Sequence, residues 1–139
     1  MAKKNFKTFM PIRANNQRVV LDENNGTSKV TAFTPATEDS LIYSISLYNS
    51  EGVTHYLNIY YNKSGVSEPF TQIEIPASVG TDGTNSPRKE AIDEMNSQNS
   101  GDGNQFLLIP AAWTLECNLV SLPSAGNKVV VLFSGQDFG

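Results

Sequence analysis

The feature that most constrains the fold is the alternation of side chains in the segment LIYSISLYNS, which starts at Leu41. Odd-numbered positions share one face of an extended chain and even-numbered positions the other: Leu41, Tyr43, Ile45 and Leu47 against Ile42, Ser44, Ser46 and Tyr48. A period of two over eight residues is typical of a β-strand, because a helix would repeat every 3.6 residues. The segment therefore predicts a strand of a β-sheet.

A second alternating segment, THYLNIYYN, follows a short turn that contains Glu51 and Gly52. One face carries His55, Leu57, Ile59 and Tyr61, and the other carries Tyr56, Asn58 and Tyr60. We expect these two segments to pair as an antiparallel hairpin. A second hairpin is expected between residues 18–21 and 29–33, because the Asn25-Gly26 pair between them tolerates positive φ angles.

Further strands are predicted along the rest of the chain, at 71–75, 106–109, 113–119 and 128–133. The last of these, from Lys128 to Phe133, is apolar on both faces, which predicts a central strand. The count is about eight antiparallel strands, and their regular spacing predicts a single all-β domain, a β-sandwich of jelly-roll-like type.

Two segments differ from this pattern. Residues 1–16 have no usable period, so we interpret them as an extended N-terminal arm, with Phe6, Phe9 and Met10 as its anchors and the sandwich as residues 17–139. Residues 77–104 are rich in Gly, Ser and Asn, which predicts an insertion loop. Within it, Pro87 at a first helical position and the spacing of Ala91, Ile92 and Met95 predict a short helix.

The charge is distributed unevenly along the chain. All five basic residues of the first 18 positions precede the first acid, Asp22. The remainder carries 5 basic residues against 14 acidic ones, a net charge of −9, and the formal net charge of the whole chain is −4. An acidic body repels nucleic acid and anionic membranes, so neither is expected as a partner. The basic first 18 residues remain able to contact phosphate or an acidic patch on a neighbouring protein.

The start of the chain, MAKKNFKTFMPIR, lacks the apolar stretch of a signal peptide, and no run reaches the length that a membrane span needs. Cys117 is the only cysteine, so no intrachain disulfide can form. The Asn-x-Ser/Thr triplets at Asn25 and Asn62 are interpreted as turns. We therefore expect a protein that folds in a cytoplasm.

Residues with catalytic chemistry are few. His55 is the only histidine and shares the face of Leu57 and Ile59, so we interpret it as a residue at the edge of the core rather than a general base. Cys117 follows the apolar phase of its strand and is interpreted as a buried structural residue. Asp82, Asp102 and Asn104 lack the spacing of a calcium loop. We expect no enzyme, no cofactor and no metal.

Tyr48, Tyr56 and Tyr60 fall on the polar faces of the two strongest strands. Two interpretations stay open for them. Tyrosines raise β propensity by ordinary cross-strand packing, and they are also enriched at interfaces and on surfaces that stack sugars.

The ending NKVVVLFSGQDFG, with Gly135, Asp137 and Phe138, resembles that of small β-sandwich virion proteins of tailed bacteriophages. The Lys-rich start, the two alternating strands and the Ile-Glu-Ile-Pro segment at Ile73–Pro76 are also similar. The resemblance implies a capsid decoration or cement protein that binds the major capsid protein or other virion subunits, is often a trimer, and is made in the bacterial cytoplasm before joining the virion.

The candidate interface residues are drawn from the arm, the tyrosines and the terminal motif: Phe6, Phe9, Met10, Arg13, Tyr48, Tyr56, Tyr60, Asp137 and Phe138. Two alternatives remain: a tail, head-fibre or adaptor subunit of the virion, or a glycan-binding β-sandwich module.

Overall fold

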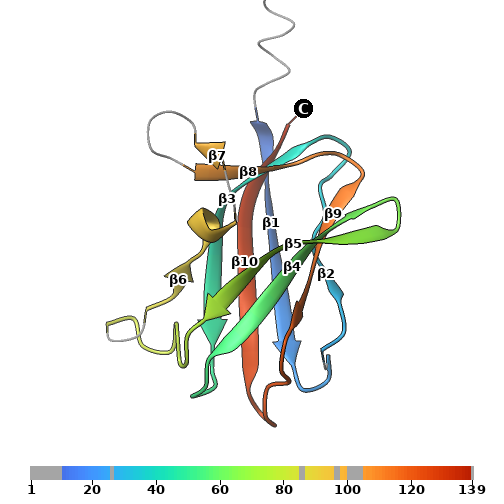
Figure 1. Cartoon of the computed structure of the whole chain (residues 1–139). Coiled ribbons are helices and arrows are strands. Elements are labelled where there is room, and N and C mark those ends of the chain that lie inside the picture. Colours follow the sequence, from blue (N-terminus) through green and yellow to red (C-terminus); the bar gives the residue numbers. More distant parts are fainter. Residues whose placement is uncertain (1–10, 26, 85–86, 96–97, 100–104, 139) are drawn as a thin grey trace, which may run out of the picture.

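The structure, a computed structural model, describes residues 11–25, 27–84, 87–95, 98–99 and 105–138 (Figure 1). Within these residues the chain is almost entirely β, as the sequence predicts. The elements are β1 (Pro11–Asp22), β2 (Val30–Phe33), β3 (Ser40–Asn49), β4 (His55–Lys63), β5 (Val66–Ile75), β6 (Lys89–Glu90), the 3-10 turn η1 (Ile92–Glu94), β7 (Gln98–Asn99), β8 (Gln105–Ile109), β9 (Trp113–Leu119) and β10 (Lys128–Phe138). Eight of these strands are four residues or longer, which confirms the predicted number.

Two antiparallel sheets form the sandwich. The first has the order β1-β10-β3-β8-β7, with β6 also paired to β3, and the second has the order β2-β9-β4-β5. The eight longer strands pair as a nested ribbon: β1 with β10, β2 with β9, β3 with β8, and β4 with β5. A long antiparallel ribbon rolled into two facing sheets is a jelly roll. The predicted central position of β10 is confirmed, because it lies between β1 and β3.

Two predicted hairpins are wrong. β3 and β4 belong to different sheets, and so do β1 and β2. The turns between them carry the chain across the sandwich instead of back along a neighbouring strand. Side-chain alternation reports which face of a strand is buried, but it is the same whether the next strand lies beside it or in the opposite sheet.

The core lies between the sheets, and the predicted inward face of β4 is confirmed, since His55, Leu57 and Ile59 are all buried. In β3 the inward phase changes along the strand: Ile42 is buried, and so is Ile45, while Tyr43 is 45% exposed. The pairing register between β3 and β10 shifts at Ser134/Gly135, so Tyr43 is the extra residue of a β-bulge. Leu41 and Tyr43 therefore do not share the face of Ile45 and Leu47, as uninterrupted alternation predicts.

The sandwich begins earlier than the sequence indicates. β1 starts at Pro11, and its residues from Arg13 to Asn16 pair with Asp137 to Ser134 of β10. Residues 11–16 of the predicted arm thus belong to the first sheet, so the predicted boundary at residue 17 is wrong. Arm residues 1–10, including Phe6, Phe9 and Met10, lie outside the described residues.

The helix predicted in the insertion is wrong, because among its described residues only the three of η1 are helical, and they form a 3-10 turn. Ala91 and Met95 are nevertheless fully buried, so the apolar positions were identified correctly and their local structure was not. Glu90, which a helix would have turned to solvent, instead accepts hydrogen bonds from the Ile45 amide at 2.7 Å and the Ser44 hydroxyl at 2.5 Å. The insertion therefore continues the edge of β3 beyond the end of β8.

Side-chain hydrogen bonds join the two sheets at the edge formed by β1 and β2, away from the insertion. The Gln17 amide of β1 donates to the carbonyl oxygen of Thr34 at 2.6 Å and accepts from the Thr34 amide at 3.0 Å. These two bonds imitate a pair of strand hydrogen bonds and join the edge strands of the two sheets. No helix within the described ranges is long and apolar enough to cross a membrane.

Candidate functional site

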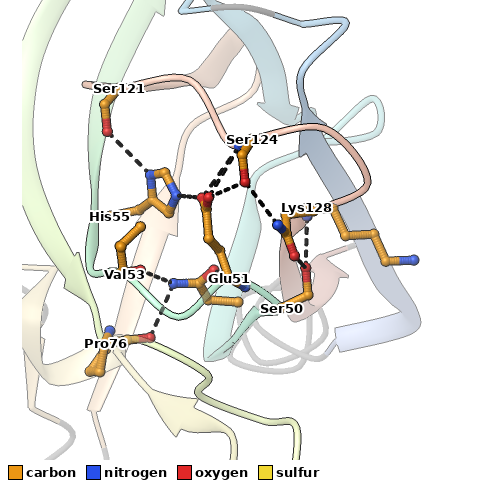
Figure 2. A network of polar contacts seen from close by, with 10 residues as sticks. Ser50, Glu51, Val53, His55, Pro76, Ser121, Ser124 and Lys128 are labelled. Atoms are coloured by element: carbon orange, nitrogen blue, oxygen red, sulfur yellow. Dashed lines mark hydrogen bonds and ion pairs between the residues drawn. The ribbon is translucent and has the colours of Figure 1, made fainter.

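The connections of the jelly roll gather at its two ends. The β3–β4 and β9–β10 connections lie at one end, and the start of β1 and the end of β10 lie at the other (Figure 1). The β4–β5 turn projects to one side, away from the first end (Figure 1). At the first end a network of polar side chains joins residues 49–55 to residues 121–128 (Figure 2). This network contains His55, the only histidine of the chain.

His55 stands at the centre of the network and is only 1% exposed. Its Nε2 lies 2.7 Å from Oε1 of Glu51, and its Nδ1 lies 3.3 Å from the hydroxyl oxygen of Ser121 (Figure 2). Because a carboxylate only accepts hydrogen bonds, Nε2 is the nitrogen that carries the proton, and in the neutral ring Nδ1 accepts from Ser121. The imidazole thus bridges the two connections.

Glu51 binds the β9–β10 connection directly. Its carboxylate accepts hydrogen bonds from the hydroxyl and the backbone amide of Ser124, the amide lying 3.2 Å from Oε2. The Ser124 hydroxyl, and next the imidazole of His55, hold the pKa of Glu51 below its ordinary value of 4.5. The carboxylate therefore remains ionised at neutral pH and can anchor the connection.

Asn49, whose side chain is fully buried, also holds the β3–β4 connection in place. Its amide donates to the carbonyl oxygens of Val53 at 2.9 Å and Pro76 at 3.2 Å, and its own oxygen accepts from the Glu51 amide. Ser50 adds a hydrogen bond to Asn127 of the other connection. Each buried polar group here has a partner, which is what makes such a network rigid.

A hydroxyl, an imidazole and a carboxylate in series have the order of a hydrolytic triad. A triad also needs a cavity that holds substrate against the hydroxyl. Two hollows on the described surface are lined by β4, β5 and the start of β9, and neither is lined by Ser121 or Ser124. His55 is almost completely buried, which agrees with its predicted position at the edge of the core. We call the hydrogen-bonded group of Glu51, His55, Ser121 and Ser124 the brace.

The brace supports a group of exposed apolar side chains, which we call the loop-end patch: Val53, Tyr56, Val120 and Leu122. They are 53%, 42%, 53% and 51% exposed, and they make up four of the seven large apolar residues exposed in the described part. The Val120 amide donates to the Tyr56 carbonyl at 3.0 Å, which ties the two segments together. Contiguous patches of exposed apolar surface are a common feature of interaction sites.

The predicted tyrosine face does not exist as one surface. Tyr56 and Tyr60 lie on the second sheet and Tyr48 on the first, so the sandwich separates them. Tyr48 packs under Arg88, whose guanidinium carbon is 5.5 Å from the ring centre. The Tyr60 hydroxyl donates to Asn118, and Lys29 lies over the Tyr60 ring. Only Tyr56 joins the loop-end patch.

The terminal candidates lie at the other end of the molecule. Asp137 is 4% exposed and accepts hydrogen bonds from Ser40 at 2.5 Å and Asn15 at 2.9 Å. The exposed Arg13 guanidinium lies 3.9 Å from the second oxygen of Asp137. Phe138 is half-buried, and its amide donates to the Asp39 carbonyl. Asp137 is thus engaged inside the fold.

Cys117 is fully buried, and burial raises the pKa of its thiol to about 12, so the nucleophilic thiolate does not form at neutral pH. Among the described residues, no group of three or more His, Cys, Asp or Glu side chains is placed to hold a metal ion.

The sequence predicts the burial of His55 and the outward face of Tyr56, and the structure has both. Sequence reasoning did not point to the other residues of the brace and the patch: Glu51, Ser121, Ser124, Val53, Val120 and Leu122. One sequence feature could have indicated the patch. Val120 and Leu122 follow directly after the strand that ends at Leu119, where a turn is ordinarily polar. Comparison with protein-family models and with curated proteins finds no match for this chain.

Proposed function

We propose that this protein is a non-enzymatic structural protein of a bacteriophage virion, a decoration or cement protein that binds and stabilises the major capsid lattice. The observation that carries the proposal is the loop-end patch, in which exposed apolar side chains stand on a hydrogen-bonded frame. The jelly-roll topology is in keeping with it, since this fold recurs in viral capsid and lectin domains. The ending Gly135–Phe138 adds the resemblance to phage virion proteins.

A cement protein must contact more than one subunit of a shell. The loop-end patch lies at one end of the sandwich, and the strand that follows the basic residues Lys3, Lys4 and Lys7 starts at the other end. A β1 strand of 12 residues spans about 40 Å. Contacts at both ends would therefore join groups that lie on different subunits, and the basic segment would suit an acidic patch on the lattice.

The proposal is tested on particles that lack the protein. Val120→Asp with Leu122→Asp should place charges in the patch and lower the occupancy of the particles, while removal of residues 1–10 should weaken attachment separately. Leu108→Asp is the matched control, because Leu108 is 38% exposed but lies on β8 in the other sheet. Occupancy that stays at the wild-type level in both the patch variant and the truncation would contradict the proposal.

The alternative within the same class is a tail, head-fibre or adaptor subunit. Quantitative mass spectrometry of purified particles separates the two. Hundreds of copies per particle support the capsid shell, and a dozen or fewer support the tail or the portal. The same particles, crosslinked and sized, test the trimer that the resemblance implies.

A further inference from the structure

The turn that joins β4 to β5 forms the tip of the rolled ribbon and projects beside the body of the sandwich (Figure 1). At this tip the surface is hollowed. The hollow has a volume of about 310 Å³ and is lined by Tyr61, Lys63, Val66, Glu68 and Trp113. Ligand pockets begin at about 300 Å³, so the hollow has room for a small ring and not for an extended chain. It lies away from the end that carries the loop-end patch.

Aromatic rings form the floor of the hollow. The ring centres of Tyr61 and Trp113 are 5.4 Å apart in an edge-to-face arrangement, and those of Tyr61 and Phe70 are 4.5 Å apart. Tyr61 and Trp113 line the hollow, Phe70 supports Tyr61 from outside it, and all three rings pack against the hydrophobic core. A ligand that stacks on this floor would therefore meet a surface that is already ordered, which reduces the entropy lost on binding.

Polar groups that make no hydrogen bond or ion pair in the described part of the chain surround these rings. The Lys63 ammonium lies 5.3 Å from the centre of the Trp113 ring and forms no ion pair in the described part of the chain. Within the same residues, the Glu68 carboxylate, the Tyr61 hydroxyl and the Trp113 ring N–H have no hydrogen-bond partner either. Burial raises the pKa of Tyr61, so its hydroxyl remains a neutral donor. The hollow thus offers donors and an acceptor around an apolar floor.

We propose that this hollow is a binding site for a neutral pyranose ring of a glycan. A pyranose presents an apolar C–H face, which stacks on aromatic rings, and a rim of hydroxyls, which both donate and accept hydrogen bonds. Lys63 and Trp113 donate to that rim, and Glu68 accepts from it. The single positive and single negative charge cancel, which favours a neutral sugar over an acidic one.

This site is independent of the proposed attachment to the capsid. A protein held to a lattice by its loop-end patch would keep the hollow free, because the hollow lies at the β4–β5 turn, away from the end that carries the patch. The glycan site also differs from the one that the sequence suggested at Tyr48, Tyr56 and Tyr60, since none of these lines the hollow.

Trp113 is the only tryptophan of the chain, so its fluorescence reports directly on the hollow. The full-length protein is titrated with maltose, cellobiose, lactose and diacetylchitobiose into the millimolar range. Sialyllactose tests the preference for neutral sugars, and glycerol controls for polyols that lack a ring. We expect a saturable change in tryptophan emission with at least one neutral disaccharide, weaker binding of sialyllactose than of lactose, and no saturation with glycerol.

Variants then test the lining. Lys63→Ala, Glu68→Gln and Tyr61→Phe should each weaken binding by about threefold to tenfold, the loss expected for one hydrogen bond. Tyr43→Phe is the matched control, because Tyr43 is 45% exposed on β3 in the other sheet and lies outside both the hollow and the loop-end patch, and it should bind as the wild type does. The proposal is overturned if no disaccharide gives saturation, if glycerol saturates as well, or if the three lining variants bind like the control.

Discussion

At Gly135 the backbone of β10 passes so close to β3 that no side chain fits. A Cβ atom placed there would lie 2.6 Å from the carbonyl oxygen of Leu41, next to the bulge at Tyr43. The glycine of the terminal motif is thus required by the register of the first sheet. Asp137, two residues further, accepts its bonds from Ser40 and Asn15 inside the fold. The motif that carries the family resemblance has a structural role in this chain.

Gly135→Ala should therefore destabilise the protein. The obstructing atom belongs to the backbone, so the two strands must move apart, and overpacking of this kind costs about 1–3 kcal/mol. Urea denaturation measures the loss. Gly52→Ala is the control, because nothing lies within 4 Å of a Cβ at that position, and it should leave stability unchanged or slightly raised. Equal midpoints for the two variants would show that the close approach is not a constraint.

Glu51 should make the stability of the fold depend on pH. Hydrogen bonds from Ser124 and His55 lower its pKa in the folded protein below the ordinary 4.5. A lowered folded-state pKa contributes stability that is fully present above pH 4.5 and is lost as the pH falls through the folded value. Glu51→Gln cannot titrate, so its urea midpoint should fall less than that of the wild type between about pH 7 and about pH 3.

The matched control for Glu51 is Glu68→Gln, because the Glu68 carboxylate has no hydrogen-bond partner in the described structure. It should retain the acid sensitivity of the wild type. If Glu51→Gln loses stability with acid as steeply as the wild type and the control do, the brace does not depend on the ionised carboxylate.

Among the elements, the insertion between β5 and β8 completes the sandwich where β8 ends. Its β6 segment pairs with β3. The Glu90 carboxylate accepts hydrogen bonds from the Ile45 amide at 2.7 Å and from the Ile92 amide at 3.0 Å. Lys89 reaches across to the carbonyl oxygen of Glu74 on β5, at the edge of the other sheet. The insertion thus covers the edge between the two sheets with short, bonded segments, which also protects that edge from pairing with another chain.

Glu90→Ala should loosen the insertion. The Ile45 and Ile92 amides would lose their acceptor, and an unsatisfied buried donor costs about 1–3 kcal/mol. We expect faster hydrogen exchange at the Ile45 amide and faster proteolysis within residues 77–104. Asp93→Ala is the control, because Asp93 is exposed on the same insertion. Exchange and cleavage rates that match those of the control would mean that β6 is held without Glu90.

The elements also show what a sequence can predict for this chain. Alternation identified the buried faces of β4, β5 and β9, because burial is a property of each strand alone. The bulge at Tyr43 depends on the register with β10, and the partners of β3 depend on strands that are distant along the chain. The loop-end patch combines residues 53–56 with residues 120–122, which only the rolled ribbon brings together. For this reason Tyr56 was identified and Leu122 was not.

At the scale of the whole molecule, the nested pairing places the first strand, β1, beside the last, β10. β1 pairs with β10 along almost its full length, so neither end of the chain can form its strand early without the other. Loops of this size are costly to close, and β-sandwiches dominated by distant pairings fold in about milliseconds to seconds. The stability of the whole sandwich therefore depends on where β1 begins.

Two truncations locate that beginning. Removal of residues 1–10 keeps all of β1 and should leave the urea midpoint and its cooperativity unchanged. Removal of residues 1–16 also deletes the pairing of Arg13–Asn16 with β10, and the buried Asp137 loses the Asn15 amide, which should lower the free energy of unfolding by about 2 kcal/mol or more. A chain that tolerates both deletions equally would place the start of the fold at residue 17, as the sequence predicts.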